Sequence, residues 1–179
     1  MAKILVAYTT WAGATRDVGE KIAKELRNNN LQVIFDNAKN INSISDYSAV
    51  IFGTSIHMGK PTGDFKNFLR KFHKQLIYKK TALFTLSFNM IDDNEKNRTE
   101  TLNWLKKVTD KYTDLKPISI GLFAGAAITD SSEYGKLNIF IKKMITLMKT
   151  NMETQQGKSD FRNWDAIQLW TTKLIEKIA

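Results

Sequence analysis

The sequence KILVAYTTWAGAT at residues 3–15 passes from an apolar run into small and hydroxylated residues. Residues 3–8 carry the aliphatic and β-branched side chains of a buried strand. Val18, Ile22 and Leu26 then recur at helical spacing after a loop over residues 9–15. A strand that leads through a short loop into a helix is the repeating unit of a parallel sheet covered by helices. This stretch therefore predicts an α/β fold.

The same alternation continues along the chain. Four more strands are expected, at residues 31–36, 49–54, 81–88 and 116–124. The later helices are predicted by apolar residues at helical spacing, namely Phe65, Phe68, Leu69 and Phe72, then Leu102, Leu105 and Val108, and finally Trp164, Ile167, Trp170, Leu174 and Ile178. Five strands with intervening helices suit a doubly wound parallel sheet in the order 2-1-3-4-5. In that order, the ligand crevice lies beyond the carboxyl ends of strands 1 and 3.

Residues 126–157 separate the fifth strand from the last helix by more than an ordinary loop, so we interpret them as an insertion. Residues 136–149 within it form a basic amphipathic pattern. Its predicted apolar face carries Leu137, Phe140, Ile141, Met144, Ile145 and Met148, and the other side carries Lys136, Lys142, Lys143 and Lys149. Either this helix docks its apolar face on the domain, or it meets a membrane surface or a partner.

Length and composition limit the remaining possibilities. The 179 residues, 42% of them hydrophobic, predict one domain over residues 1–179. No stretch has the pattern of a transmembrane helix or a secretory signal, so a cytoplasmic protein is expected. Zero cysteines exclude thiol nucleophiles, and with two distant histidines no metal site is expected. The net charge of +9 favours an anionic partner of some kind.

The loop at residues 9–15 has the chemistry of an anion site. Its small residues let backbone N–H groups converge, its threonines add hydroxyls, and the following helix N-terminus adds partial positive charge. It contains neither a Walker-type sequence nor a dinucleotide glycine motif, so nucleotide triphosphate and dinucleotide sites are not expected. The strand ends at Tyr8 and Gly53 lack the carboxylates of a magnesium-binding receiver domain.

Two loops resemble those of a known family. The pattern Thr10-x-Ala12-Gly13-x-Thr15 resembles the T-x-T-G-x-T phosphate loop of flavodoxins, with Ala12 in place of the middle threonine. Residues 53–60, GTSIHMGK, are similar to a loop of the flavodoxin-domain group that contains menaquinone-dependent protoporphyrinogen dehydrogenase. That group also carries an insertion before its last helix and a G-x-x-D with a following D-W or N-W step, matched here by residues 157–165.

The resemblance implies noncovalently bound FMN, with its phosphate in the first loop and its ring between the loops after strands 3 and 4. The residues implied in cofactor binding are Thr9, Thr10, Trp11, Ala12, Gly13, Ala14 and Thr15; Ser55, Ile56, His57, Met58 and Gly59; Ser87, Phe88, Asn89 and Met90; and Gly125 and Ala126. His57 is the candidate catalytic residue, either stabilising an anionic reduced flavin or guiding a proton, although a lone loop histidine is often merely exposed to solvent.

The first functional hypothesis is an FMN-dependent oxidoreductase that passes electrons from an organic donor to a quinone-like acceptor. Its partners would be a small redox substrate or a quinone, with peripheral contact at the inner face of the cell membrane through residues 136–149. The alternative is a flavodoxin-like electron carrier that serves redox proteins, but ordinary carriers are usually acidic. A nucleic-acid-binding module has neither a motif nor aromatic interleaving to support it, so no nucleic acid partner is expected.

Overall fold

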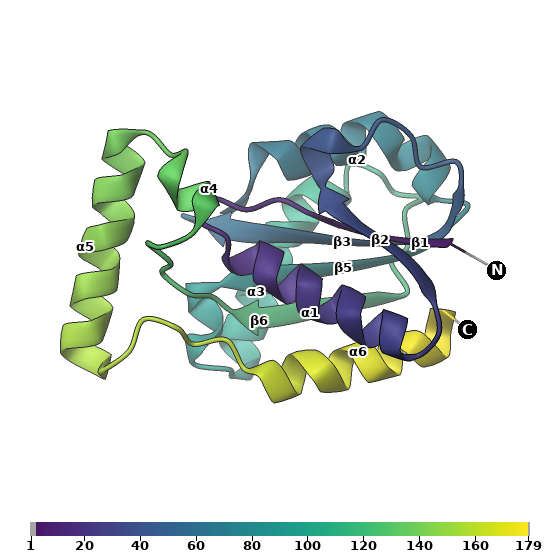
Figure 1. The fold of residues 1–179 in the computed structure, drawn as a ribbon. Helices are drawn as coiled ribbons and strands as arrows, with labels where there is room; N and C mark the ends of the chain where they lie inside the picture. Colours follow the sequence, from purple (N-terminus) through teal and green to yellow (C-terminus); the bar gives the residue numbers. More distant parts are fainter. Residues whose placement is uncertain (1–2, 179) are drawn as a thin grey trace.

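The computed structural model describes residues 3–178 and contains one twisted parallel sheet (Figure 1). The strands β1 (Lys3–Tyr8), β2 (Gln32–Asn37), β3 (Tyr47–His57), β5 (Lys80–Ser87) and β6 (Ser119–Ala124) lie in the order β2-β1-β3-β5-β6. Each neighbouring pair is parallel. This confirms the predicted doubly wound sheet of five parallel strands.

Two strand boundaries differ from the prediction by three residues, and the others differ by two or fewer. β3 runs on to His57 because its end pairs with a short antiparallel strand, β4 (Lys60–Pro61), through a tight turn at Met58 and Gly59. β6 begins at Ser119 rather than at residue 116, and Pro117 explains the delay because it has no N–H to donate to a ladder. The extended β3 carries its last residues beyond the edge where the other strands stop.

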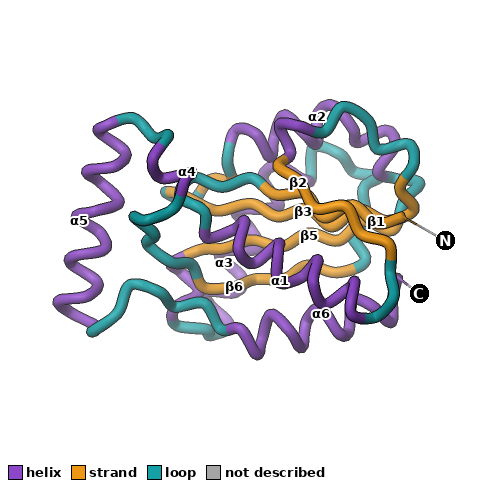
Figure 2. The backbone as a smooth tube through the Cα atoms, viewed as in Figure 1, coloured by secondary structure: helices purple, strands orange, loops and turns teal. Residues whose placement is uncertain are grey.

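Helices cover both faces of the sheet (Figure 2). α1 (Ala14–Asn28) and α6 (Trp164–Ile178) bury their apolar sides against one face, and α2 (Gly63–Leu76) and α3 (Glu95–Thr109) against the other. On the α2 side, the ring of Phe52 stacks on Phe65 and packs against Phe68 at a tilt. Short 3-10 turns, η1 (Ala38–Asn40) and η2 (Phe88–Ile91), follow β2 and β5.

The insertion forms α4 (Ser132–Gly135) and α5 (Ile139–Gln156), and α5 stands across the end of the sheet, opposite both termini (Figure 1). Its predicted apolar face is divided in the structure. Ile145 is buried and Ile141 and Met148 are half-buried, whereas Phe140 is 82% and Met144 42% exposed. Lys142 and Lys149 fold back onto Gly135 and Thr129 instead of extending into solvent. Among residues 3–178, no helix is long and apolar enough to cross a bilayer.

Candidate functional site

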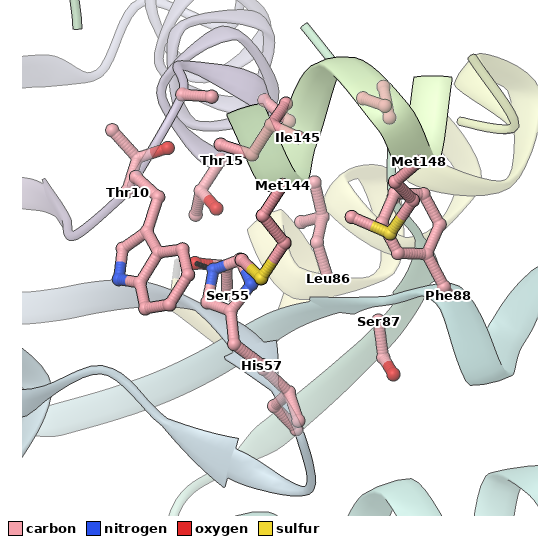
Figure 3. A pocket seen from close by; sticks show the side chains of 17 residues that line it. Thr10, Thr15, Ser55, His57, Leu86, Ser87, Phe88, Met144, Ile145 and Met148 are labelled. Atoms are coloured by element: carbon pink, nitrogen blue, oxygen red, sulfur yellow. Dashed lines mark hydrogen bonds between the residues drawn. The ribbon is translucent and has the colours of Figure 1, made fainter. Parts of the chain in front are cut away.

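A cleft lies where the carboxyl ends of β1, β3, β5 and β6 meet α5. It has a narrow inner cavity of about 40 Å³ and an outer cavity of about 320 Å³, which share Trp11, Ile56, His57, Ser87, Phe88, Met144 and Met148 in their walls. Figure 3 shows Thr10 and Thr15 on one side, with Met144, Ile145 and Met148 coming from the helix that covers the inner cavity. The crevice is at the predicted switch point between β1 and β3.

The loop between β1 and α1 presents unused donors to the inner cavity. Gly13 takes a left-handed conformation with φ of 99°, and its N–H donates to Thr10 Oγ1 over 3.0 Å. α1 has no side-chain cap on its first turn, whereas α2 to α5 are each capped by a Thr, Asn or Ser side chain. The first-turn N–H groups and the positive end of the α1 dipole are therefore available to an anion.

The buried hydroxyl of Thr15 is the strongest indication of an anion site in this loop. Its side chain is fully buried and lines the inner cavity, yet Oγ1 has no hydrogen-bond partner among the described residues. A buried hydroxyl without a partner costs free energy that the fold does not recover by itself. The orphaned hydroxyl, together with the uncapped helix, fits a phosphate group.

Three residues expected to bind the cofactor lie outside both cavities. Thr9 is buried, and its hydroxyl donates to the carbonyl of Gly53 and accepts from Thr62, which also bonds to Thr54. Gly13 shapes the loop without lining the cavities, and Met90 is a buried residue of η2. The structure thus assigns Thr9 a role in holding β1, β3 and α2 together beneath the cleft.

Ala12 stands where the resembling family has a threonine, and the insertion explains the difference. The Ala12 methyl group is buried in a small apolar cluster with Ala127 and Ile145 of α5. Ser131 Oγ, at the start of α4, donates to the Ala12 carbonyl over 2.7 Å. A hydroxyl at position 12 would point into this apolar contact, where it would be costly. Alanine at position 12 therefore lacks the hydroxyl of the family's threonine but packs against the insertion.

His57 and Trp11 form the junction between the two cavities. Their rings are stacked with centroids 3.8 Å apart, and His57 Nε2 lies 2.8 Å from Ser55 Oγ. Burial lowers the pKa of His57 to about 4, so the imidazole is neutral near pH 7. A neutral ring exchanges hydrogen bonds but holds no positive charge. Both roles expected of His57, stabilising an anionic reduced flavin and guiding a proton, stay predictions.

The outer cavity is completed by a residue that sequence reasoning missed. Trp104 of α3 lines it, and a Cβ placed on Gly59 would lie 3.1 Å from the indole Nε1. Gly59 has φ of 71°, so glycine suits this turn both in conformation and in space. Met58 beside it is 92% exposed at the rim. Nothing in the local sequence marks Trp104, because its helix only meets this turn through the fold.

The loop after β5 forms the opposite wall. Phe88 lines both cavities and Asn89 the outer one, while Asn89 Nδ2 donates to the Asn97 carbonyl and to Thr101 Oγ1. Gly125 and Ala126 line the inner cavity. The other lining residues not foreseen from the sequence are Leu86, Ala127, Met144, Ile145 and Met148. Of the described residues, none that lines either cavity is Asp, Glu, Lys or Arg.

The two cavities together fit a flavin nucleotide in their chemistry. The outer one is walled by aromatic and thioether side chains, which suit a planar aromatic ring. The inner one ends at the hydrogen-bond donors of the loop at residues 9–15, called the phosphate-type loop below. Its volume of about 40 Å³ is far below the roughly 300–1,000 Å³ of ligand pockets, so a flavin nucleotide would fit only if side chains around it moved. Met144 and Met148 are unbranched and can repack.

Comparison with known proteins identifies the family. A profile described as flavodoxin domain matches residues 5–160, which is most of the chain and includes every strand of the sheet. The chain belongs to the flavodoxin domain family. The predicted resemblance is thereby confirmed at the family level.

Curated relatives of this flavodoxin-domain chain carry one enzyme name. A protoporphyrinogen IX dehydrogenase [quinone] from Leishmania major is 28% identical over 174 residues, covering 93% of this chain and 71% of the relative. A protein of the same name from Escherichia coli (strain K12) is 25% identical over 162 residues, covering 89% of this chain and 84% of the relative.

Solved structures are similar in fold. Oxidised flavodoxin 2 from Bacillus cereus superposes with a TM-score of 0.58 at 15% identity, covering 98% of this chain and 99% of that one. A Fusobacterium nucleatum flavodoxin bound to flavin mononucleotide gives a TM-score of 0.57 at 17% identity, covering 100% of both chains. At this identity, the likeness establishes the flavodoxin-like fold.

Proposed function

We propose that this protein is an FMN-dependent oxidoreductase that moves electrons from an organic donor to a quinone-like acceptor. The observation that carries the proposal is the cleft itself, with an orphaned buried hydroxyl and an uncapped helix at one end and an aromatic, uncharged cavity at the other. The enzyme name of the curated relatives and the FMN bound to a flavodoxin of similar fold support it.

Some residues of the chain would bind the cofactor, and others would shield it from water. FMN, when bound, supplies the electron-transfer chemistry. The hydroxyls of Thr10 and Thr15 and the first N–H groups of α1 would hold its phosphate. Trp11, Phe88 and Trp104 would contact its ring, and α5 would exclude water from the inner cavity. Neutral His57, anchored by Ser55, is placed to exchange a proton at the junction.

A quinone-like acceptor is favoured by the uncharged cleft and by the position of α5. Ile139, Phe140 and Leu147 are 70%, 82% and 56% exposed on the outer side of this helix. Residues 136–149 contain four lysines, of which Lys136 and Lys143 are exposed, and no acidic residue. Exposed apolar side chains among lysines suit peripheral contact with an anionic membrane, where lipid-soluble quinones reside. Peripheral membrane contact through residues 136–149 is therefore part of the proposed function.

A second candidate is a flavodoxin-like carrier with no substrate site of its own. The exposed rim favours it, because Met58 projects into solvent beside the outer cavity, where a redox protein can reach. The net charge of +9 would then select an acidic partner protein. The two candidates share the cofactor site and differ in whether a small molecule reoxidises the protein catalytically.

The proposal is tested with purified protein titrated with FMN, reduced without oxygen, and mixed with menadione. We expect a bound-flavin spectrum and rapid reoxidation of the reduced flavin by menadione, which takes up its two electrons. Bound flavin that menadione does not reoxidise would favour the carrier, and no flavin binding would refute both candidates.

A matched pair of variants tests the cofactor site. Thr15→Val should weaken FMN binding about tenfold or more, since a hydrogen bond to a charged group is lost. Its stability without flavin should be unchanged or higher, because Oγ1 has no partner to lose. Thr172→Val, at an exposed position on α6, should alter neither property. Equal FMN affinity in Thr15→Val would contradict the placement of the phosphate.

A further inference from the structure

A carboxylate from the insertion lies against the phosphate-type loop. Glu133 Oε2 comes within 3.6 Å of the point that a Cβ on Gly13 would occupy, and the Glu133 side chain is only 17% exposed. Its other oxygen, Oε1, pairs with Arg16 Nε over 3.6 Å. Arg16 is in the first turn of α1, which has no side-chain cap. A partly buried negative charge therefore sits beside donors that suit an anion.

The other charged groups nearby are paired with one another and not with Glu133. The acidic residue in the first turn of α1, Asp17, is paired with Arg162, which also binds Asp160. Across the insertion, Glu153 is paired with Lys149. Glu133 and Arg16 thus form the ion pair beside Gly13. The charge is also felt at the end of β1, where burial first and Glu133 second raise the pKa of Tyr8.

The same segment of the insertion is fastened to the loop. Ser131 Oγ donates to the Ala12 carbonyl, and its Cβ and Oγ lie 3.1 and 3.2 Å from the point of a Cβ on Gly13. Glu133 follows two residues later, and Ser132 Oγ donates to its carboxylate. These contacts hold the carboxylate close to the loop instead of leaving it free in solvent.

We propose that Glu133 is a specificity-determining residue that weakens binding of a phosphate group at this loop and competes with that phosphate for Arg16. The inference rests on the proposed function, in which the phosphate belongs to FMN. Without phosphate, Glu133 and Arg16 pair and keep the insertion against the loop. With phosphate, Arg16 gains a second anionic partner and the repelled carboxylate loosens α4. The preference for FMN over riboflavin, which has the same ring and no phosphate, is therefore smaller than the loop donors alone would give.

The test compares FMN with riboflavin on the full chain, using quenching of flavin fluorescence to measure both dissociation constants. Glu133→Gln should bind FMN about tenfold more tightly, as expected for removing a partly buried charge near a doubly charged group. It should bind riboflavin within about twofold of the unchanged protein, because an uncharged chain feels little of that charge. Glu153→Gln, the matched carboxylate elsewhere on the insertion, should change neither constant.

Arg16→Gln supplies a second variant with the opposite sign. It should weaken FMN binding and leave riboflavin binding nearly unchanged, because the cation is lost while Glu133 stays. Equal changes for both flavins in Glu133→Gln would mean that the residue is merely structural and would overturn the inference. An unchanged FMN constant in that variant would also overturn it.

Inorganic phosphate separates this inference from the proposed function. If the unchanged protein binds neither flavin, the proposed function fails, and thermal unfolding in increasing phosphate still tests Glu133. Phosphate should then raise the unfolding midpoint more in Glu133→Gln than in Glu153→Gln at equal ionic strength. Identical responses of these two variants would overturn the role of Glu133 at the loop.

Discussion

The Ala12→Thr substitution tests whether the insertion dictates the sequence of the loop between β1 and α1. Ala12 is 9% exposed and packs with Ala127 and Ile145. A threonine adds a methyl group and a hydroxyl to this packed contact. Overpacking costs about 1–3 kcal/mol, and burying an unpartnered hydroxyl costs a similar amount, about 1–3 kcal/mol. Since threonine can rotate one group outward, we expect a total loss of about 2 kcal/mol in the free energy of unfolding.

Thermal and urea unfolding of the protein without flavin would measure this loss. For a chain of this size, about 2 kcal/mol corresponds to a fall in Tm of about 4–8 °C. Ala166→Thr, at an exposed position on α6, is the control for the same substitution without burial and should cost less than about 0.7 kcal/mol, the difference in helix propensity.

A double-mutant cycle with Ile145→Ala identifies the partner. Ile145→Ala alone should cost about 2–4 kcal/mol because it leaves a cavity under α5. In that background, the added threonine has room, so Ala12→Thr should cost at least about 1 kcal/mol less than it does alone. The reasoning is refuted if Ala12→Thr has no effect on stability, or if its cost is the same in both backgrounds.

Three further predictions concern stability and its pH dependence. Thr62→Val should lower the free energy of unfolding by about 1–2 kcal/mol in urea, because Thr62 caps α2 and bonds to Thr9 and Thr54; an exposed-site Thr172→Val that costs as much would contradict this. Because the pKa of His57 falls from 6.5 to about 4 on folding, its contribution is complete above pH 6.5 and is lost as the pH falls toward 4. The loss should be about 3 kcal/mol, and a pH profile that keeps its slope in His57→Asn would rule this out. Arg162→Gln should cost about 1–2 kcal/mol, because the Arg162 side chain is buried while the Asp17 and Asp160 carboxylates that it leaves unpaired are 39% and 47% exposed, and a loss below about 0.5 kcal/mol in thermal unfolding would count against that ion-pair network.

Features of the fold that depend on neighbouring residues in the sequence were predicted best. The strand at residues 3–8, the helical periodicity of Val18, Ile22 and Leu26, and the strand order were all confirmed by the structure. Most residues of the predicted loops line the cleft, because the carboxyl ends of parallel strands meet at one edge of the sheet. The exceptions are Thr9, Gly13 and Met90, which do not line the cleft. The spacing of residues in the sequence does not determine the direction in which each side chain points.

In the insertion, hydrophobic periodicity did not predict which apolar residues of α5 are buried. Periodicity placed Phe140 and Met144 with Ile145 on one apolar face, but Phe140 is 82% exposed, and only the side that carries Met144, Ile145 and Met148 faces the domain. An amphipathic stripe says which residues prefer burial, while the width of the buried strip depends on the surface that receives it. Here the receiving surface is a small loop region at Ala12 and Ala127.

By itself, the sequence determined the α/β class, the strand order and the loops that carry the cleft, because hydrophobic period and turn residues act over neighbouring positions. Only the tertiary structure decided which side chains meet across long separations, as in Ala12 with Ile145, Arg16 with Glu133 and Gly59 with Trp104. It also decided that His57 is neutral, since burial sets that pKa. Such contacts depend on how packed elements come together in space, and no local stretch of sequence contains that information.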